Sequence, residues 1–103
     1  MSMQSTGGKL RQIRELLELP LRRVAVMIDV DVAVLSKMER GERKLTKDIV
    51  RKLANIYNYN ENELLVLFLS DKIIYDLQGE ELGIVTLKVA EDKIKLQNSK
   101  LKK

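Results

Sequence analysis

The chain has 103 residues, of which 45% are hydrophobic and 33% charged, with no cysteine, no histidine and only three tyrosines and one phenylalanine. This length allows one domain or a small headpiece with a short extension, and it leaves the core to aliphatic side chains. No apolar run approaches the ~20 residues of a membrane span, and the N-terminus lacks a signal-peptide pattern. Together with the absence of cysteine, this composition suits a cytoplasmic protein without a membrane partner.

The net charge of +4 is distributed unevenly. Residues 1–60 carry twelve Lys/Arg against seven Asp/Glu, residues 61–92 carry two against eight, and residues 93–103 carry five lysines and no acid. A basic front half suits contact with nucleic-acid phosphates, which would repel the acidic middle. Because charged faces are often simply solvated, the charge distribution by itself leaves both interpretations open.

The apolar spacing is helical throughout and predicts an all-α fold. A first helix is expected over residues 9–18, where leucine and isoleucine form one stripe. Pro20 suits the start of a short second helix that ends at Ile28, because a helix does not need the missing N–H in its first turn.

The next two helices have clear start and stop signals. Asp31 suits the N-cap of a third helix over residues 32–40, and Gly41 suits its end because glycine readily takes the left-handed conformation there. Thr46 can cap a fourth helix that carries apolar residues up to Ile56.

The last third of the chain predicts two further helices. Asn60 has a glutamate three residues later, a variant of the capping box, and opens a fifth helix that reaches Leu69 and extends to Leu77. Gly79 is the expected stop. A sixth helix over residues 81–96 carries two separate apolar rows.

Two short helices joined by a tight turn, the second ending in Glu-Arg-Gly, are the informative part of the chain. They resemble the XRE, or phage-repressor-like, helix-turn-helix family over residues 9–69. This resemblance implies a five-helix repressor-like headpiece with an additional C-terminal helix. It rests on these residues, in the family's order and intervals: Val24-Ala25, Leu35-Ser36-Lys37-Met38-Glu39-Arg40-Gly41 and Leu53-Ala54.

The resemblance also implies that the two helices have different roles in DNA binding. The helix over residues 32–40 matches the recognition helix, which lies in the major groove, and the helix over 21–28 crosses the phosphate backbone. The positions that match base contacts are Val32, Ala33, Ser36 and Lys37. The positions expected at phosphates are Arg43, Lys44 and Lys47, and Arg22 and Arg23 are expected to contact phosphates or bases.

The sequence departs from the family pattern at the reading positions. Relatives often carry Gln or Thr where this chain has Leu21 and the run Val32-Ala33-Val34. Apolar side chains can press on thymine methyl groups but cannot make bidentate hydrogen bonds to bases. The alternative is that Val32 and Val34 are core or dimer contacts. Asp29 replaces the usual glycine of the turn, and it tolerates that backbone better than most residues.

Arg14 and Glu39 match positions that form an ion pair in the family. Such a pair would join the first helix to the end of the recognition helix and fix the angle between these two helices. The alternative is that they are two ordinary surface charges.

The predicted organisation has four parts. A disordered leader spans residues 1–8, the helix-turn-helix domain 9–69, a helical extension 70–97 and a basic tail 98–103. Apolar rows that one small core does not use commonly bind a partner chain, so residues 64–95 are assigned to homodimerisation.

The predicted function is a sequence-specific DNA-binding transcriptional regulator that acts as a dimer on a two-fold operator. Within the family the chain most resembles stand-alone regulators found beside restriction–modification genes. One alternative is an antitoxin that represses its own operon and binds a toxin protein through the acidic residues 61–92. Another is a protein-interaction module that has lost DNA binding.

Catalysis is not expected. The chain has no histidine or cysteine, no paired carboxylates suited to acid–base work, no glycine-rich phosphate loop and no metal-ligand spacing. We therefore expect no catalytic residues, no metal and no cofactor.

Overall fold

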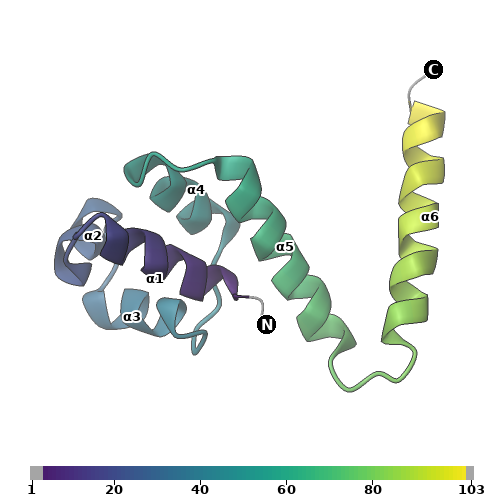
Figure 1. The fold of residues 1–103 in the computed structure, drawn as a ribbon, viewed down its shortest axis with the longest axis horizontal. Coiled ribbons are helices and arrows are strands. Elements are labelled where there is room, and N and C mark those ends of the chain that lie inside the picture. Colours follow the sequence, from purple (N-terminus) through teal and green to yellow (C-terminus); the bar gives the residue numbers. More distant parts are fainter. Residues whose placement is uncertain (1–3, 102–103) are drawn as a thin grey trace. The chain divides into compact units, whose positions relative to one another are not determined.

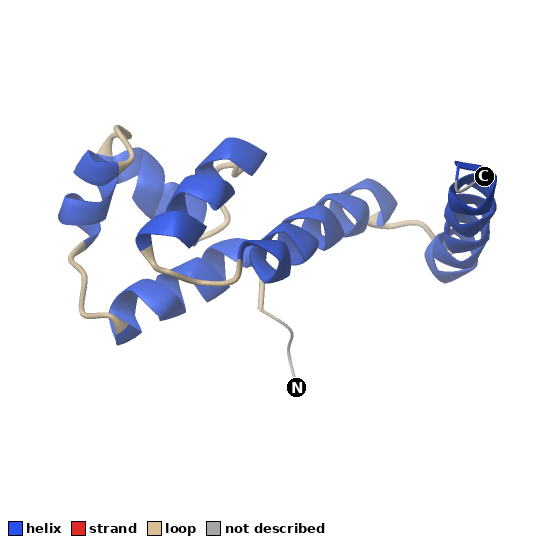
Figure 2. Ribbon diagram, turned by 90° about the horizontal axis from the view of Figure 1, so that it is seen from above, coloured by secondary structure: helices blue, strands red, loops and turns tan. Residues whose placement is uncertain are grey.

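The computed structural model describes residues 4–101, and this part of the chain is all-helical (Figures 1 and 2). Its helices, in chain order, are α1 (Thr6–Leu16), α2 (Leu21–Met27), α3 (Val32–Glu39), α4 (Lys47–Ile56), α5 (Glu61–Leu77) and α6 (Gly83–Leu101). The predicted all-α fold with a sixth, C-terminal helix is confirmed. The chain forms two compact units, the first ending at Lys72 and the second beginning at Ile73.

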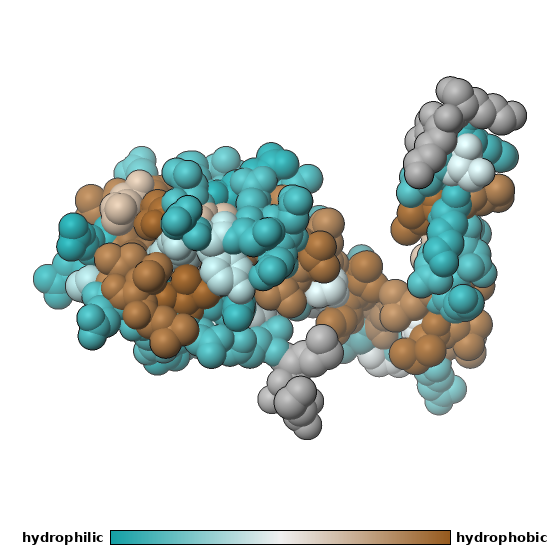
Figure 3. All heavy atoms as spheres, turned by 45° about the horizontal axis from the view of Figure 1, so that its top comes forward, coloured by the Kyte–Doolittle hydropathy of each residue, from teal (hydrophilic) through white to brown (hydrophobic). Residues whose placement is uncertain are grey.

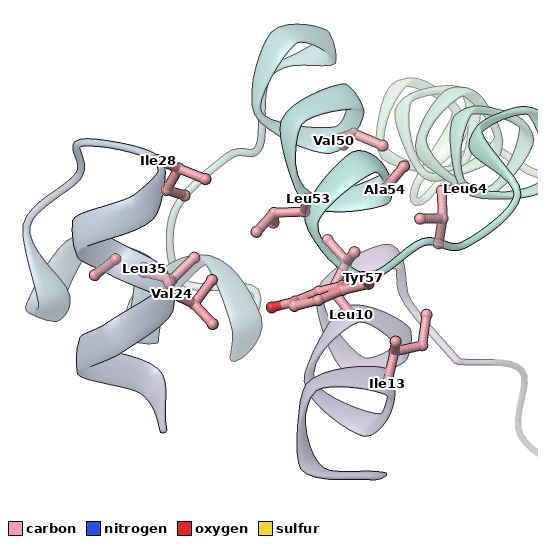
Figure 4. Close-up of a cluster of buried hydrophobic side chains, with 11 residues drawn as sticks. Leu10, Ile13, Val24, Ile28, Leu35, Val50, Leu53, Ala54, Tyr57 and Leu64 are labelled. Atoms are coloured by element: carbon pink, nitrogen blue, oxygen red, sulfur yellow. The ribbon is translucent and has the colours of Figure 1, made fainter. Parts of the chain in front are cut away.

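The first unit, here called the headpiece, is built around one aliphatic core (Figure 4). Helix α3 packs against both α1 and α2, and α4 and the start of α5 complete the core. Each of the five helices contributes at least one fully buried side chain, so the helix-turn-helix cannot move independently of the rest. The fully buried apolar residues are Leu10, Val24, Leu35, Val50, Leu53 and Leu64.

The turn between α2 and α3 follows the predicted signals. Asp29 adopts a positive φ of 56°, the left-handed conformation that Asp tolerates better than most residues. The Asp31 carboxylate accepts a hydrogen bond from the N–H of Ala33 at 2.8 Å and so caps α3. Gly41, with a φ of 77°, follows the end of α3 as expected.

Helix α1 begins earlier than predicted. Ser5 caps it by accepting from the Gly8 N–H at 3.1 Å, and Thr6, which is buried, is its first residue. The Thr6 N–H and hydroxyl both donate to the Asp71 carboxylate of α5, at 2.8 and 2.7 Å. The prediction of a disordered leader is therefore wrong for residues 5–8, because α5 supplies a carboxylate that orders them. Residues 1–3 lie outside the described part.

The same contact moves the end of the headpiece. The predicted boundary after residue 69 is too early, since Asp71 bonds to α1 and the compact unit extends to Lys72. Leu64 is fully buried in the headpiece core, so its assignment to a dimer interface is wrong.

Helix α6 starts at Gly83 and runs on to Leu101, beyond the predicted end at Leu96. Residues 98–101 of the predicted basic tail are therefore part of α6, while residues 102–103 lie outside the described part. Ion pairs one turn apart support this helix, with Lys95 Nζ 3.2 Å from a Glu91 carboxylate oxygen.

Gly7 generates a stability prediction. A Cβ at this position would clash with the Met38 carbonyl oxygen and lie 2.9 Å from that of Glu39. We expect Gly7→Ala to lower the free energy of unfolding by about 1–3 kcal/mol, because α1 must shift away from the end of α3. Urea denaturation followed by circular dichroism measures the change.

Gly8→Ala is the matched control. A Cβ there meets only the Ser5 hydroxyl oxygen, at 3.3 Å, and the gain in helix propensity of up to about 1 kcal/mol offsets the adjustment of that side chain. Equal losses of stability in the two variants would contradict the close packing of Gly7 on α3.

Candidate nucleic-acid interface

Helices α2 and α3 present one buried and one exposed face. Val24, Ala25 and Leu35 lie in the core, which fixes the orientation of both helices. The opposite side carries most of the predicted DNA-contact residues. Exposed on it are Arg22, Arg23, Val32, Ala33 and Lys37.

The predicted base-contact positions differ in how available their side chains are. Val32 is 41% exposed, which excludes the alternative that it is a core residue, whereas Val34 is half-buried. Ser36 is also half-buried, and its hydroxyl oxygen accepts a hydrogen bond from Arg40 Nη1 at 2.8 Å. Lys37 is therefore the freer of the two polar side chains predicted to contact bases.

Arg40 is held in place from two sides. Besides its bond to Ser36, its Nε donates to the Glu42 carboxylate at 2.7 Å. This hydrogen bond, reinforced by the arginine charge, lowers the pKa of Glu42. Both side chains are exposed, so the pair shapes the end of α3 more than it stabilises the fold.

The basic residues fall on two parts of the headpiece. Arg22 and Arg23 lie in the first turn of α2, and they line a shallow depression together with Val32 at the start of α3. Arg43 and Lys44 lie in the connection between α3 and α4, and Lys47 is the first residue of α4. All five side chains are exposed. Their contacts with phosphates remain predictions.

The depression also contains apolar residues that the sequence analysis did not single out. Val26 is 76% exposed and Met27 54% exposed on α2. Their exposure could have been predicted from the sequence, because both residues fall outside the helical stripe of α2 that faces the core. The full lining is Pro20, Leu21, Arg22, Arg23, Val26, Met27 and Val32.

Arg14 and Glu39 form a bidentate ion pair between α1 and the end of α3. The Arg14 Nε lies 2.8 Å from one Glu39 carboxylate oxygen and Nη2 lies 3.1 Å from the other. The third guanidinium nitrogen, Nη1, donates to the Leu19 carbonyl at 2.9 Å. The side chains are only 12% and 5% exposed, and the bond to Glu39 raises the pKa of Arg14. These contacts point to a structural role for the pair.

Tyr57 is buried close enough to this ion pair to interact with both of its charges. Its hydroxyl is buried without a hydrogen-bond partner among the described residues, and Figure 4 shows it directed toward the side of the core that holds Val24. Burial, and then the negative charge of Glu39, raise the pKa of Tyr57 well above its usual range, while Arg14 opposes the shift. An ion pair beside such a group is screened little by solvent.

The described residues contain no group of three or more acidic, histidine or cysteine side chains that could hold a metal ion. Within residues 4–101, no helix has the length and apolarity needed to cross a membrane.

The Arg14–Glu39 pair generates a prediction about coupling. We expect Arg14→Met and Glu39→Gln each to lower the free energy of unfolding by about 3–5 kcal/mol, because each leaves a buried charge without its partner. The double variant should cost less than the sum of the two, with a coupling of about 0.5–3 kcal/mol. Chemical denaturation of the unaltered protein, the two single variants and the double variant measures this coupling energy.

Arg11 and Glu15 provide the control cycle on the same helix. Their charged groups lie 3.6 Å apart and both side chains are more than half exposed, so their coupling should stay below about 0.5 kcal/mol. A coupling between Arg14 and Glu39 no larger than this would show that the buried pair does not hold α1 to α3.

Comparison with known families agrees with this geometry. A family model described as Helix-turn-helix matches residues 10–64, more than half of the chain, and these residues include α2, α3 and their turn. No significant match is found among curated proteins or among solved structures. The family match shows that the chain belongs to the XRE-type helix-turn-helix family of DNA-binding transcription regulators.

Proposed function

We propose that the protein is a homodimeric, sequence-specific regulator that binds a two-fold operator in duplex DNA. The observation that supports specific binding is the exposed outer face of α2 and α3, whose inner face is locked in the headpiece core. In this proposal the start of α3 and Lys37 meet base edges in the major groove. Phosphates are bound by Arg22, Arg23, Arg43, Lys44 and Lys47.

The second unit supports dimerisation because it has no core of its own. Residues 73–100 contain no buried side chain, although many of them are large and apolar. So much exposed apolar surface on so few residues is typical of an interaction site. Figure 3 shows apolar side chains exposed between charged ones along α6.

Helix α6 exposes apolar residues on two sides. Val85 and Leu87 are about 200° apart around the helix, so they belong to separate rows. One row consists of Val85, Val89 and Leu96, and the other of Ile84, Leu87 and Ile94. A helix with two apolar sides needs apolar neighbours. A second chain can provide them in a dimer, and the alternative is that α6 folds back on its own headpiece and completes a monomeric core.

Helix α5 exposes a further apolar row on the side away from the headpiece core. Leu64 and Phe68 pack in or against the core, whereas Val66, Leu69 and Ile73 are exposed at helical spacing. In this proposal each of these exposed rows, on α5 and on α6, is available for contact with a second chain. The two headpieces can then be set about one helical turn of DNA apart, ~34–36 Å, for adjacent major grooves.

The same uncovered surface favours one second candidate, an antitoxin whose exposed α5 and α6 rows bind a toxin protein. The two candidates differ in solution, because only the first predicts that the isolated chain forms dimers. The resemblance to regulators of restriction–modification genes makes such genes the first candidates for its target.

The proposed phosphate contacts predict a steep dependence of binding on salt. Each neutralised phosphate contributes about −0.9 to the slope of log affinity against log salt concentration. We expect Lys47→Ala and Lys44→Ala each to weaken binding to all duplexes alike and to reduce that slope by about 1. Lys37→Ala should in addition change which sequence is preferred. Fluorescence anisotropy titrations at several salt concentrations measure both effects.

Lys52→Ala is the control, since this lysine pairs with Asp48 on the side of α4 and is not among the proposed contacts. Its slope should equal that of the unaltered protein. Binding that hardly changes between about 50 and 200 mM salt would contradict the phosphate contacts.

The dimer proposal predicts the effect of a charge in the α6 rows. Leu87→Glu and Val89→Glu should each convert the protein from twice the 11.9 kDa chain mass to the single chain, because a carboxylate cannot be buried unpaired in the interface. Lys88→Gln, on the charged side of α6, should remain a dimer. Light scattering measures the mass, and a monomeric full-length chain would favour the antitoxin candidate.

A further inference from the structure

We propose that the start of α3 reads thymine through its C5-methyl group, with Val32 and Ala33 as the contact residues and the adjoining depression as an apolar extension of the contact. This inference rests on the proposed function, because it specifies which chemical group of an operator the headpiece recognises. It concerns the same exposed face of the helix-turn-helix.

The first step is the absence of polar side chains at the start of α3. Val32 and Ala33 occupy the first turn and both are exposed. Neither side chain can donate or accept a hydrogen bond, so neither can read the polar edge of a base. The two residues leave only apolar contact as a means of discrimination.

The second step concerns the polar residues nearby. The Ser36 hydroxyl is half-buried and accepts a hydrogen bond from Arg40 on its own helix. The Asp31 carboxylate accepts from the Ala33 N–H as the N-cap of α3. Arg40 orients the Ser36 hydroxyl, which is only half-exposed, and Asp31 caps the helix. Lys37 is therefore the exposed polar side chain among the proposed base contacts.

The third step is the apolar surface that continues from Val32 onto α2. Leu21, Val26 and Met27 line the same depression, and Val26 and Met27 are largely exposed. Water covers this surface in the free headpiece, so its burial against an apolar group is favourable. In the major groove the thymine C5-methyl is the apolar group that base pairs present.

The charges around the depression favour DNA over a protein as its occupant. Arg22 and Arg23 line it, and their charges can attract phosphates next to it. Asp29 and Asp31 are exposed in the adjacent turn, where their charges oppose close contact with a phosphate. Together these charges direct the turn and the start of α3 toward base edges.

The test uses the full-length protein and a duplex that it selects from a random-sequence pool. The selected duplex is resynthesised with deoxyuridine in place of thymidine at one position at a time, which removes only the C5-methyl group. Burial of one methyl corresponds to about fourfold in affinity. We expect a loss of about this size at one or two thymines of each half-site and no change at the others.

Two variants assign the effect to the proposed residues. In Val32→Ala the ratio of affinities for the thymine and uracil duplexes should fall toward one at the sensitive position. Leu16→Ala, which truncates a side chain that is 77% exposed on α1, should leave that ratio unchanged. A 5-methylcytosine introduced at the sensitive position of a cytosine-substituted duplex should recover part of the lost affinity.

The outcomes separate the inference from the proposed function. Suppose that binding is selective and salt-dependent but that the thymine and uracil duplexes bind equally well at every position. This result overturns recognition of the methyl group and leaves the regulator proposal standing. If Val32→Ala leaves the thymine-to-uracil affinity ratio unchanged, another residue contacts the methyl group, and the proposed role of Val32 is overturned. Failure to select any duplex overturns the proposed function and this inference with it.

Discussion

The buried bond between Arg14 and Glu39 is the contact on which the geometry of the reading head depends. One guanidinium binds both carboxylate oxygens of Glu39 at the end of α3 and the Leu19 carbonyl ahead of α2. Gly7 lets the start of α1 approach the same end of α3, and the buried Tyr57 interacts with both charges of the pair. The recognition helix is thus held by α1 at its C-terminal end, which leaves its N-terminal turn exposed.

Polar groups inside the headpiece and those on its outer face have different roles. Inside the headpiece the charges and hydroxyls mostly have partners, as with Thr6 on Asp71 and Arg14 on Glu39. On the outer face the recognition helix begins instead with exposed apolar side chains beside Arg22 and Arg23. The chain belongs to a family of DNA-binding regulators, and the chemistry of this face supports the proposal that it combines phosphate binding with apolar contact to bases.

The two units differ in how much of their apolar surface they bury. The headpiece buries a residue from each of its five helices in a common core, whereas residues 73–100 bury none of their apolar side chains. Exposed apolar rows on two sides of α6 are costly in water, which supports the proposal that this helix binds a partner chain. In that proposal the first unit binds DNA and the second unit contributes to association.

The sequence by itself determined the helices, most of their ends and the family. Apolar periodicity, the Asp31 cap and Gly41 act within a few residues, so they can be read locally. The Arg14–Glu39 pair followed from the family resemblance rather than from any local pattern. Only the tertiary structure decided that Asp71 orders the start of α1, 65 residues away, and that Leu64 is core. Such contacts depend on how the helices pack, and helical spacing carries no information about which distant residue completes a buried hydrogen bond.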